Sequence, residues 1–392
     1  MVNQARDDSA AASAADVSDD RGRADAGHAT SAGTAAFVSR HPRAVFRSMG
    51  ELRLSSIGWS TSRGDGDDPP ATIAHAVRHG VNVFDLVPYC RQGAPLRAVA
   101  AALTGAVSRS ELVLMARVGF LAEPVQSFGV HTQMIEERYI ARGLFQWGDL
   151  ALASHCMAPS FIRHSVGQCV ELLGTGIDIL WLDTPAAQLA IIDREALAQR
   201  VRAAFSELEA CVDAGHIAGY GIARPDELQL EYVLELAREV AGERHHLRAV
   251  QFPLSLHSAE TALRPTQSVR GRRCNILQAA GELGLYPMAS NALHGAAAEY
   301  EMDAETRALL GPVVTDAQVG LQWARSLPGL GTALAGMRRS AHIEENCQVL
   351  QIPLAPADVV TAFLPEALVK RLARQPVAAL DRRVSALHDG SS

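Results

Sequence analysis

The chain has 392 residues, of which 48% are hydrophobic and 20% charged, and its net charge is −7. This is the composition of a globular protein with a full core. The acidic balance argues against a nucleic-acid-binding scaffold, which would carry a basic stripe. No apolar run reaches the ~20 residues that a membrane span needs, and the six cysteines form no C-x-x-C pair. We therefore expect a cytoplasmic protein with no membrane or nucleic-acid partner.

The two ends of the chain differ in composition from its middle. Residues 1–40 are rich in Ala, Ser, Asp and Gly, with almost no large apolar residue before Phe37. Such a segment cannot bury enough surface to offset its chain entropy, so we predict a disordered tail. It also lacks the apolar centre of a secretory signal. Residues 364–392 have helical character and scattered Arg, which predicts a C-terminal extension. The domain is expected over residues 41–363.

Short apolar runs alternate with longer stretches of helical spacing. The expected strands are residues 54–60, 81–86, 111–118, 177–183, 219–223, 249–255, 286–291 and 331–337. The expected helices are residues 71–79, 95–103, 159–173, 194–214, 225–240, 268–283, 316–326 and 341–350. Continuous apolar strands such as VNVFDL and IDILWL are typical of a parallel sheet that is buried on both faces.

Eight strand–helix units in about 310 residues predict a (β/α)8 TIM barrel. A doubly wound sheet is the alternative, but no G-x-G-x-x-G turn follows the first strand. Residues 45–49 and 52–54 flank Gly50 and predict a hairpin that closes the bottom of the barrel. The connection of residues 121–158 is long for a compact domain. Its aromatic residues predict an ordered segment over the C-terminal mouth, where barrel active sites form.

Seven segments in chain order resemble the landmark motifs of the aldo-keto reductase superfamily. They are LSSIGWST, HGVNVFDLVPYC, ELVLMARVGF, LLGTGIDILWLDTP, LEACVDAGHIAGYGIA, VQFPLSL and GMRRSAHIEENCQVL. The resemblance covers residues 46–350, and their order makes it specific for the fold. The insertion FQWGDLALASHCMAP is similar to one bacterial branch of the superfamily.

The resemblance implies a site in which Tyr donates a proton to a carbonyl while NADPH delivers hydride. In that family Lys lowers the Tyr pKa, Asp pairs with Lys, and His hydrogen-bonds the substrate oxygen. By position, Asp85 matches the Asp, whereas the Tyr, Lys and His positions hold Cys90, Arg117 and Asp183. Three of the four catalytic side chains have therefore changed chemical type.

These changes alter what the site can do. Arg117 can pair with Asp85 through a bidentate fork. Cys90 is a weak donor on a short side chain, or a nucleophile if Arg117 lowers its pKa. An ionised Asp183 opposes the negative charge of carbonyl reduction, so it must be protonated or act as a base. A metal on Cys90, Asp183 and His155 has no supporting ligand spacing, and we predict none.

The resemblance also implies positions for the NADP cofactor. Gln251 matches the residue that binds the nicotinamide carboxamide, and Ser290 replaces the aromatic that stacks on nicotinamide. Two arginines near a helix N-terminus suit a 2′-phosphate. The expected cofactor-binding residues are Gln251, Ser290, Asn291, Arg338, Arg339, His342, Glu345 and Asn346.

Two hypotheses of function follow from these residues. The first is an atypical NADP-dependent oxidoreductase for a small carbonyl or alcohol substrate, in specialised metabolism, acting as a monomer or dimer. The alternative is a repurposed barrel, either a pseudoenzyme scaffold or a non-redox lyase or hydrolase that uses Cys90 and Asp183. The degenerate site keeps both hypotheses open, because a barrel fold alone hosts many chemistries.

Overall fold

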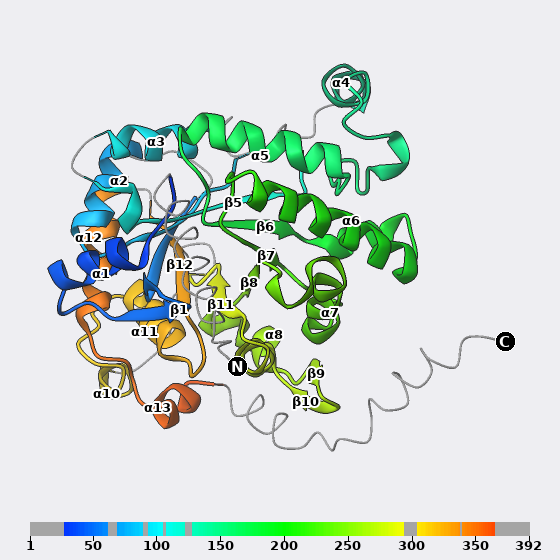
Figure 1. Cartoon of the computed structure of the whole chain (residues 1–392). Helices are drawn as coiled ribbons and strands as arrows, with labels where there is room; N and C mark the ends of the chain where they lie inside the picture. The colour runs from blue at the N-terminus through cyan, green and yellow to red at the C-terminus, as the bar shows by residue number, and fades with distance from the viewer. Residues whose placement is uncertain are drawn as a thin grey trace, which may run out of the picture.

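A computed structural model describes residues 27–61, 69–88, 93–104, 107–121, 128–293, 304–337 and 339–364. Eight parallel strands close into a barrel in the order β11-β12-β3-β4-β5-β6-β7-β8 (Figure 1). They are β3 (Ile57–Ser60), β4 (Val83–Asp85), β5 (Val113–Val118), β6 (Ile179–Asp183), β7 (Tyr220–Ala223), β8 (Leu247–Pro253), β11 (Tyr286–Ser290) and β12 (Thr332–Gly336). All eight lie at the expected strand positions, which confirms the TIM barrel.

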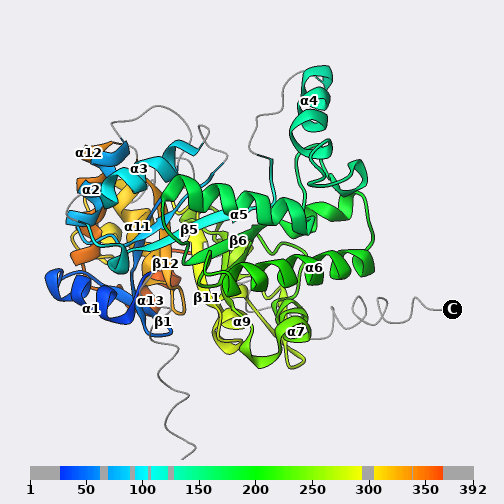
Figure 2. The ribbon, with the colours of Figure 1, turned by 45° about the horizontal axis from the view of Figure 1, so that its top comes forward.

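Helices surround the barrel and alternate with its strands (Figure 2). They are α2 (Pro69–Arg78), α3 (Ala94–Leu103), α5 (Pro159–Leu173), α6 (Arg194–Asp213), α7 (Leu230–Ala241), α9 (Ile276–Glu282), α11 (Asp316–Ser326) and α12 (Ser340–Gln348). Local side chains set their ends: Asp193 accepts from Ala196 N at the start of α6, and Gly174 ends α5 in the left-handed conformation. Shorter helices are α8 (Ala259–Leu263), α10 (Ala304–Ala308) and α13 (Ala357–Ala362).

The expected helix over residues 268–283 is wrong in its first half. Strands β9 (Gln267–Val269) and β10 (Arg272–Cys274) form an antiparallel hairpin there, and α9 begins only after Asn275. Arg270 and Gly271, with φ of +51° and +73°, make the turn between the strands. Two consecutive left-handed residues fit a hairpin turn and break a helix. Asn275 then caps α9 in a reciprocal capping box with Gln278.

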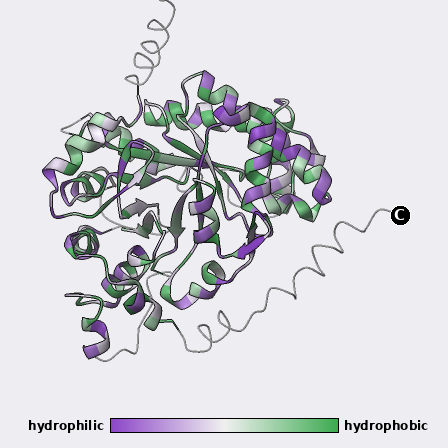
Figure 3. Cartoon of the chain, turned by 60° about the horizontal axis from the view of Figure 1, so that its bottom comes forward, coloured by the Kyte–Doolittle hydropathy of each residue, from purple (hydrophilic) through white to green (hydrophobic). Residues whose placement is uncertain are grey.

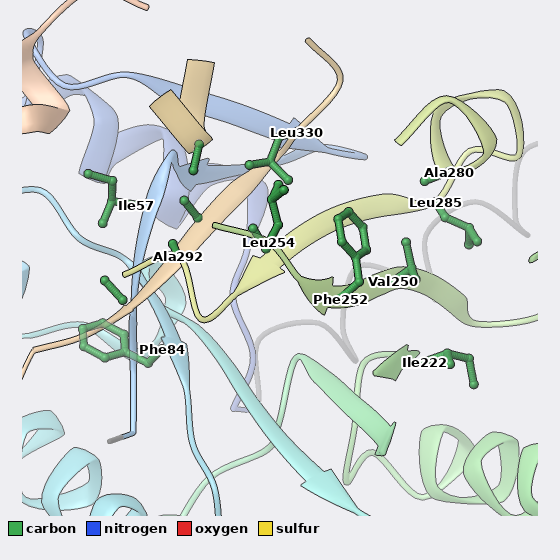
Figure 4. Close-up of a cluster of buried hydrophobic side chains, with 14 of the residues drawn as sticks. Ile57, Phe84, Ile222, Val250, Phe252, Leu254, Ala280, Leu285, Ala292 and Leu330 are labelled. Atoms are coloured by element: carbon green, nitrogen blue, oxygen red, sulfur yellow. The ribbon is translucent and has the colours of Figure 1, made fainter. Parts of the chain in front are cut away.

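The barrel has a packed interior and a larger core outside it. The outer core lies between the strands and the helices, and Figure 4 shows part of it, including Ile57, Phe84 and Val250. Inside the barrel, Trp181 is fully buried against Gly221, where an added Cβ would come within 2.4 Å of the indole ring. The strands are mainly hydrophobic and the helices mixed (Figure 3). Because side chains fill the interior, polar chemistry is confined to the barrel ends.

The N-terminal region is more ordered than its composition predicted. Helix α1 (Ser31–Arg40) buries Thr34 and Phe37, so disorder through residue 40 is wrong for this part; residues 1–26 lie outside the described residues. Phe37 packs edge-on against Phe46, Arg53 N donates to Thr34 Oγ1, and Arg40 pairs with Glu111, so apolar and polar contacts together tie the helix to the domain. The hairpin of β1 (Phe46–Met49) and β2 (Leu52–Ser55) is confirmed. Its Leu54 belongs to the interior cluster, so the hairpin closes the barrel bottom.

The chain beyond residue 120 carries an insertion with its own small core. It contains α4 (Phe128–Ile135), a π-helical turn (Glu136–Ile140) and a 3-10 turn (Trp147–Asp149). Figures 1 and 2 show α4 outside the ring of helices, so it does not cover the barrel as expected. The base of the insertion does lie at the mouth, because Phe120 pairs with His155 just beyond β5. Its core is formed by Leu121, Ile135, Tyr139, Phe145, Cys156 and Phe161.

The remaining expectations concern a membrane span and the C-terminal extension. In the described part of the chain, no helix is both long enough and apolar enough to cross a membrane. Of the predicted C-terminal extension, Leu364 is described and is nearly buried against the core, and residues 365–392 lie outside the described residues.

We predict that Phe37→Ala lowers the free energy of unfolding by about 3–5 kcal/mol, the usual range for truncating a buried aromatic. Phe37 is fully buried although it lies in a segment of tail-like composition. Urea denaturation followed by circular dichroism measures the change, with the exposed Ser39→Ala as the control. A midpoint equal to that of the control would show that α1 contributes nothing to the domain.

Candidate functional site

A buried arginine joins four strands at the C-terminal end of the barrel. Arg117, near the end of β5, donates to Asp85 Oδ2 at 2.6 Å, to Asp183 Oδ2 at 3.1 Å and to Gln251 Oε1 at 3.0 Å. Asp85 and Asp183 are the last residues of β4 and β6, and Gln251 lies on β8. Since parallel strands end at the same edge, residues distant in sequence meet here.

The charges of this group are strongly coupled. Two carboxylates share one guanidinium, and the Asp85, Arg117 and Asp183 side chains are 1%, 10% and 4% exposed. Burial weakens solvent screening, so the attraction of Arg117 for each carboxylate is stronger here than at the surface. Ser60 Oγ of β3 also donates to Asp85 Oδ2 at 3.2 Å. Asp85 Oδ1 is buried and has no hydrogen-bond partner among the described residues, so it can accept a hydrogen bond from a bound group.

Asp183 is held from both its side chain and its backbone. Thr184 Oγ1 donates to Asp183 Oδ1 at 2.9 Å, and the buried His155 donates through Nε2 to the Asp183 carbonyl oxygen at 2.9 Å. Gln188 Nε2 donates to His155 Nδ1 at 2.8 Å, which fixes the tautomer with the proton on Nε2. Desolvation lowers the pKa of His155, so the ring is neutral.

The close approach of His155 to Asp183 needs Gly119. This residue has φ of +129°, and an added Cβ would lie 2.8 Å from the Asp183 carbonyl oxygen. The residues that follow β6, β7 and β11 are also left-handed: Thr184, Arg224 and Asn291 have φ of +49°, +51° and +56°. Such conformations cost free energy and gather at sites where the surrounding structure enforces them. The C-terminal mouth is therefore the strained end of the barrel.

The expected cofactor residues are spread over three places. Gln251 belongs to the Arg117 cluster, and its Nε2 is 3.4 Å from Asp85 Oδ2. Ser290 ends β11 beside Pro253 of β8, and Asn291 is exposed just after it. The remaining described residues lie on or next to α12: Arg339, His342, Glu345 and Asn346.

The α12 residues differ in their surroundings. Arg339 is the N-cap of the helix and is exposed, as is His342 one turn later. Glu345 accepts from the Thr315 hydroxyl, and its role in the described structure is to join α12 to α11. Asn346 is 2% exposed, and its Oδ1 has no partner among the described residues. Cys90 and Arg338 lie outside the described residues.

Sequence reasoning missed the residues that support the cluster. Ser60 and Thr61 end the LSSIGWST motif, and Thr61 Oγ1 donates to the Asp85 carbonyl oxygen at 3.3 Å. Their place at a strand end was a usable signal, because barrel sites form there. His155 and Gln188 carried no such signal, since both lie outside the strands. Among the described residues no group of three His, Cys, Asp or Glu could hold a metal ion.

These elements define a class: a (β/α)8 barrel with a polar cluster at its C-terminal mouth. The model of the aldo/keto reductase family matches residues 54–267, more than half of the chain. The chain belongs to the aldo/keto reductase family. A search of curated proteins found no match.

Solved structures agree on the fold at low sequence identity. An aldo-keto reductase from Bacillus halodurans, in its holo form, is 15% identical, with a TM-score of 0.55 over 82% of this chain and 97% of that one. An aldo/keto reductase from Klebsiella pneumoniae, in complex with NADP and acetate, is 17% identical, with a TM-score of 0.54 over 83% and 96%. A putative 2,5-diketo-D-gluconic acid reductase B is 16% identical, with a TM-score of 0.55 over 84% and 95%.

We predict that Arg117→Met lowers the free energy of unfolding by about 3–5 kcal/mol, because two buried carboxylates lose their cation. Adding Asp85→Asn to this variant should restore part of the loss, since one of the repelling charges is then removed. Urea denaturation of the single and double variants gives the coupling. Arg194→Met, which breaks an exposed pair with Glu227, is the control and should cost less than about 1 kcal/mol. Strictly additive effects of the first two substitutions would contradict the coupling.

A second prediction concerns pH and His155. Burial lowers the pKa of His155 below its ordinary value of 6.5, so the unfolded chain takes up this proton at a higher pH than the folded chain. The contribution of His155 is complete above pH 6.5 and is lost as the pH falls below it. Stability measured by urea denaturation should therefore decline less steeply below pH 6.5 in His155→Gln than in the wild type. The exposed His216→Gln should follow the wild type; parallel curves for all three proteins would contradict the assignment.

Proposed function

We propose that this protein is an atypical NADP-dependent oxidoreductase acting on a small alcohol or carbonyl substrate. The observation that supports it most is the Arg117 cluster at the mouth of a barrel of the aldo/keto reductase family. It joins one cation to two carboxylates where this fold builds its active sites. Membership of the family supports the oxidoreductase class, and the replaced side chains support a changed proton-transfer step.

In the proposed reaction Asp183 is the general base. An ionised carboxylate has only acceptor oxygens, and the hydrogen bonds from Arg117 and the Thr184 hydroxyl fix the orientation of this one. It would take the hydroxyl proton of an alcohol as the carbon–hydrogen bond gives its hydride to the nicotinamide ring, leaving a carbonyl group. Arg117 would stabilise negative charge on the substrate oxygen during this step. In the reverse direction the protonated Asp183 would return the proton.

The residues fit NADP at the phosphate end. Arg339 is an exposed cation at the N-terminus of α12, where backbone N–H groups also favour an anion. The unpartnered Oδ1 of the buried Asn346 lies on the same helix and can accept from a bound group. We propose that Arg339, His342 and Asn346 bind the phosphate-bearing half of the cofactor. The nicotinamide supplies or accepts the hydride, and Gln251, Ser290 and Asn291 are the proposed residues around it.

One feature favours the alternative of a non-redox barrel. Gln251 Oε1 already accepts from Arg117, and Ser290 offers no aromatic surface for the nicotinamide. A closed cluster of this kind suits a scaffold, or a lyase or hydrolase that uses Asp183 and Cys90. The two proposals differ in one measurable property, the binding of NADPH.

The first test is a calorimetric titration with NADPH, with NADH in parallel. We expect NADPH to bind more tightly, and Arg339→Gln to weaken it about tenfold, the loss of one charge-assisted hydrogen bond of ~1.4 kcal/mol. NADH binding should be unchanged in this variant. Arg264→Gln, which removes an exposed arginine paired with Glu260, is the control. The absence of binding for both cofactors at millimolar concentration would overturn the oxidoreductase proposal in favour of the non-redox barrel.

The second test addresses Asp183 within the same proposal. Asp183→Asn keeps the shape and removes the base, so kcat on a panel of small alcohols with NADP should fall about 10²–10⁴-fold. NADPH affinity in the same variant should stay within twofold of the wild type. Turnover equal to that of the wild type would show that Asp183 is not the base.

A further inference from the structure

A cavity lies at the opposite end of the barrel from Arg117. It has a volume of about 700 Å³, between the β1–β2 hairpin and the first residues of the barrel strands. Hairpin residues Arg47 and Met49 form one wall. The opposite wall contains Ile179, Arg248, Tyr286 and Leu330, at or just before the starts of β6, β8, β11 and β12. This volume is within the range of small-molecule sites.

No salt bridge to Arg47 is found among the residues that the structure describes. Arg47 is half-buried, and its Nη2 donates to a backbone carbonyl, that of Arg325, at 3.3 Å. Its Nε is buried and has no hydrogen-bond partner among the described residues. A buried guanidinium donor without a partner is costly unless a ligand or an ion satisfies it.

Two further arginines add positive charge near Arg47. Arg248 lies on the cavity wall and is exposed, and no salt bridge to it is found in the described part of the chain. Arg325 is fully buried and donates to Ser56 Oγ and to the Ile352 carbonyl oxygen, which are neutral groups. Burial, together with the charge of Arg47, lowers the pKa of Arg325 to about 9. The arginines therefore make the electrostatic potential of this part of the described structure more positive.

The acidic side chain on the described cavity wall is already neutralised. Asp178 accepts from the backbone N–H groups of Ala29 and Leu114 and from Arg109 Nη2, at 2.6–2.8 Å. It is 2% exposed and so contributes little negative potential to the cavity. The net character of the wall is thus cationic, beside the apolar surface of Met49, Leu285 and Leu330.

We propose that this cavity binds a small amphipathic organic anion, with its carboxylate or phosphate between Arg47 and Arg248. The apolar or aromatic body of the ligand would lie against Met49, Leu285, Tyr286 and Leu330. This site is separate from the Arg117 cluster, and it does not depend on the proposed redox function. Arginine is suited to the head group because its planar fork binds carboxylate and phosphate alike.

The test is a fluorescence titration of the full chain with 8-anilinonaphthalene-1-sulfonate, an aromatic anion that stands in for the ligand. We expect saturable binding that weakens about tenfold in Arg47→Gln and in Arg248→Gln, each losing one charge-assisted hydrogen bond. The exposed Ala218 lies on the cavity wall, and Ala218→Trp should weaken binding by filling the space. Arg202→Gln removes an exposed arginine paired with Glu239 and should bind as the wild type does. Benzoate and inorganic phosphate, as competitors, show which head group the site prefers.

The outcomes separate clearly. Equal affinities for the wild type and all three cavity variants would place the dye elsewhere and overturn the proposal. If only Ala218→Trp weakens binding, the dye occupies the cavity but the arginines play no role, and the proposal that the site binds an anionic head group is overturned. Thermal melting identifies variants that fail to fold. If Arg47→Gln is one of them, the exposed positions Arg248 and Ala218 decide the result.

Discussion

The ion pairs and hydrogen bonds of the Arg117 guanidinium are the interactions on which the C-terminal end of the barrel depends. The guanidinium lies between Asp85 and Asp183 and also donates to Gln251, so one cation joins β4, β5, β6 and β8. In a buried setting the two carboxylates repel each other strongly, and the arginine fork offsets that repulsion with directed hydrogen bonds. Removing either carboxylate alone would leave Arg117 with one hydrogen-bond acceptor fewer and would change the net charge of the cluster. Structure and chemistry at this site are therefore inseparable.

The residues that hold Asp183 in place, apart from Arg117, are uncharged and lie outside the barrel strands. Thr184 binds the side chain of Asp183, and the neutral His155 binds its backbone, with Gln188 fixing the imidazole tautomer. A neutral support adds no further charge to a crowded region, and this leaves the carboxylate to act as an acceptor. The opposite end of the barrel has the reverse character, because Arg47 and Arg248 face a cavity without a free acid on its described wall. The two ends thus offer different chemistries to small molecules.

The fold was largely predictable because its signals are local. Each barrel strand is a short apolar run, and burial on both faces makes these runs stand out in the sequence. The hairpin of β9 and β10 was missed because residues 268–283 also have helical spacing, and only the left-handed turn at Arg270 and Gly271 decides between the two. The N-terminal helix was missed because Phe37 is the large apolar side chain of a segment with tail-like composition, and the polar contacts of Thr30, Thr34 and Arg40 that also hold it depend on the fold.

The sequence by itself determined the barrel and the family, and it predicted that Cys90, Arg117 and Asp183 stand at three catalytic positions of that family. Position along a motif is enough for the barrel and the family, because the motifs follow one another in the chain order of the barrel strands. Only the tertiary structure decided that Arg117 bonds both Asp183 and Gln251, that His155 supports Asp183, and that two unpaired arginines share a cavity. The three hydrogen bonds join residues 66, 134 and 28 positions apart, and Arg47 and Arg248 line one cavity from β1 and β8. Pairings at such separations are set by closure of the barrel, which brings strand ends together irrespective of local sequence.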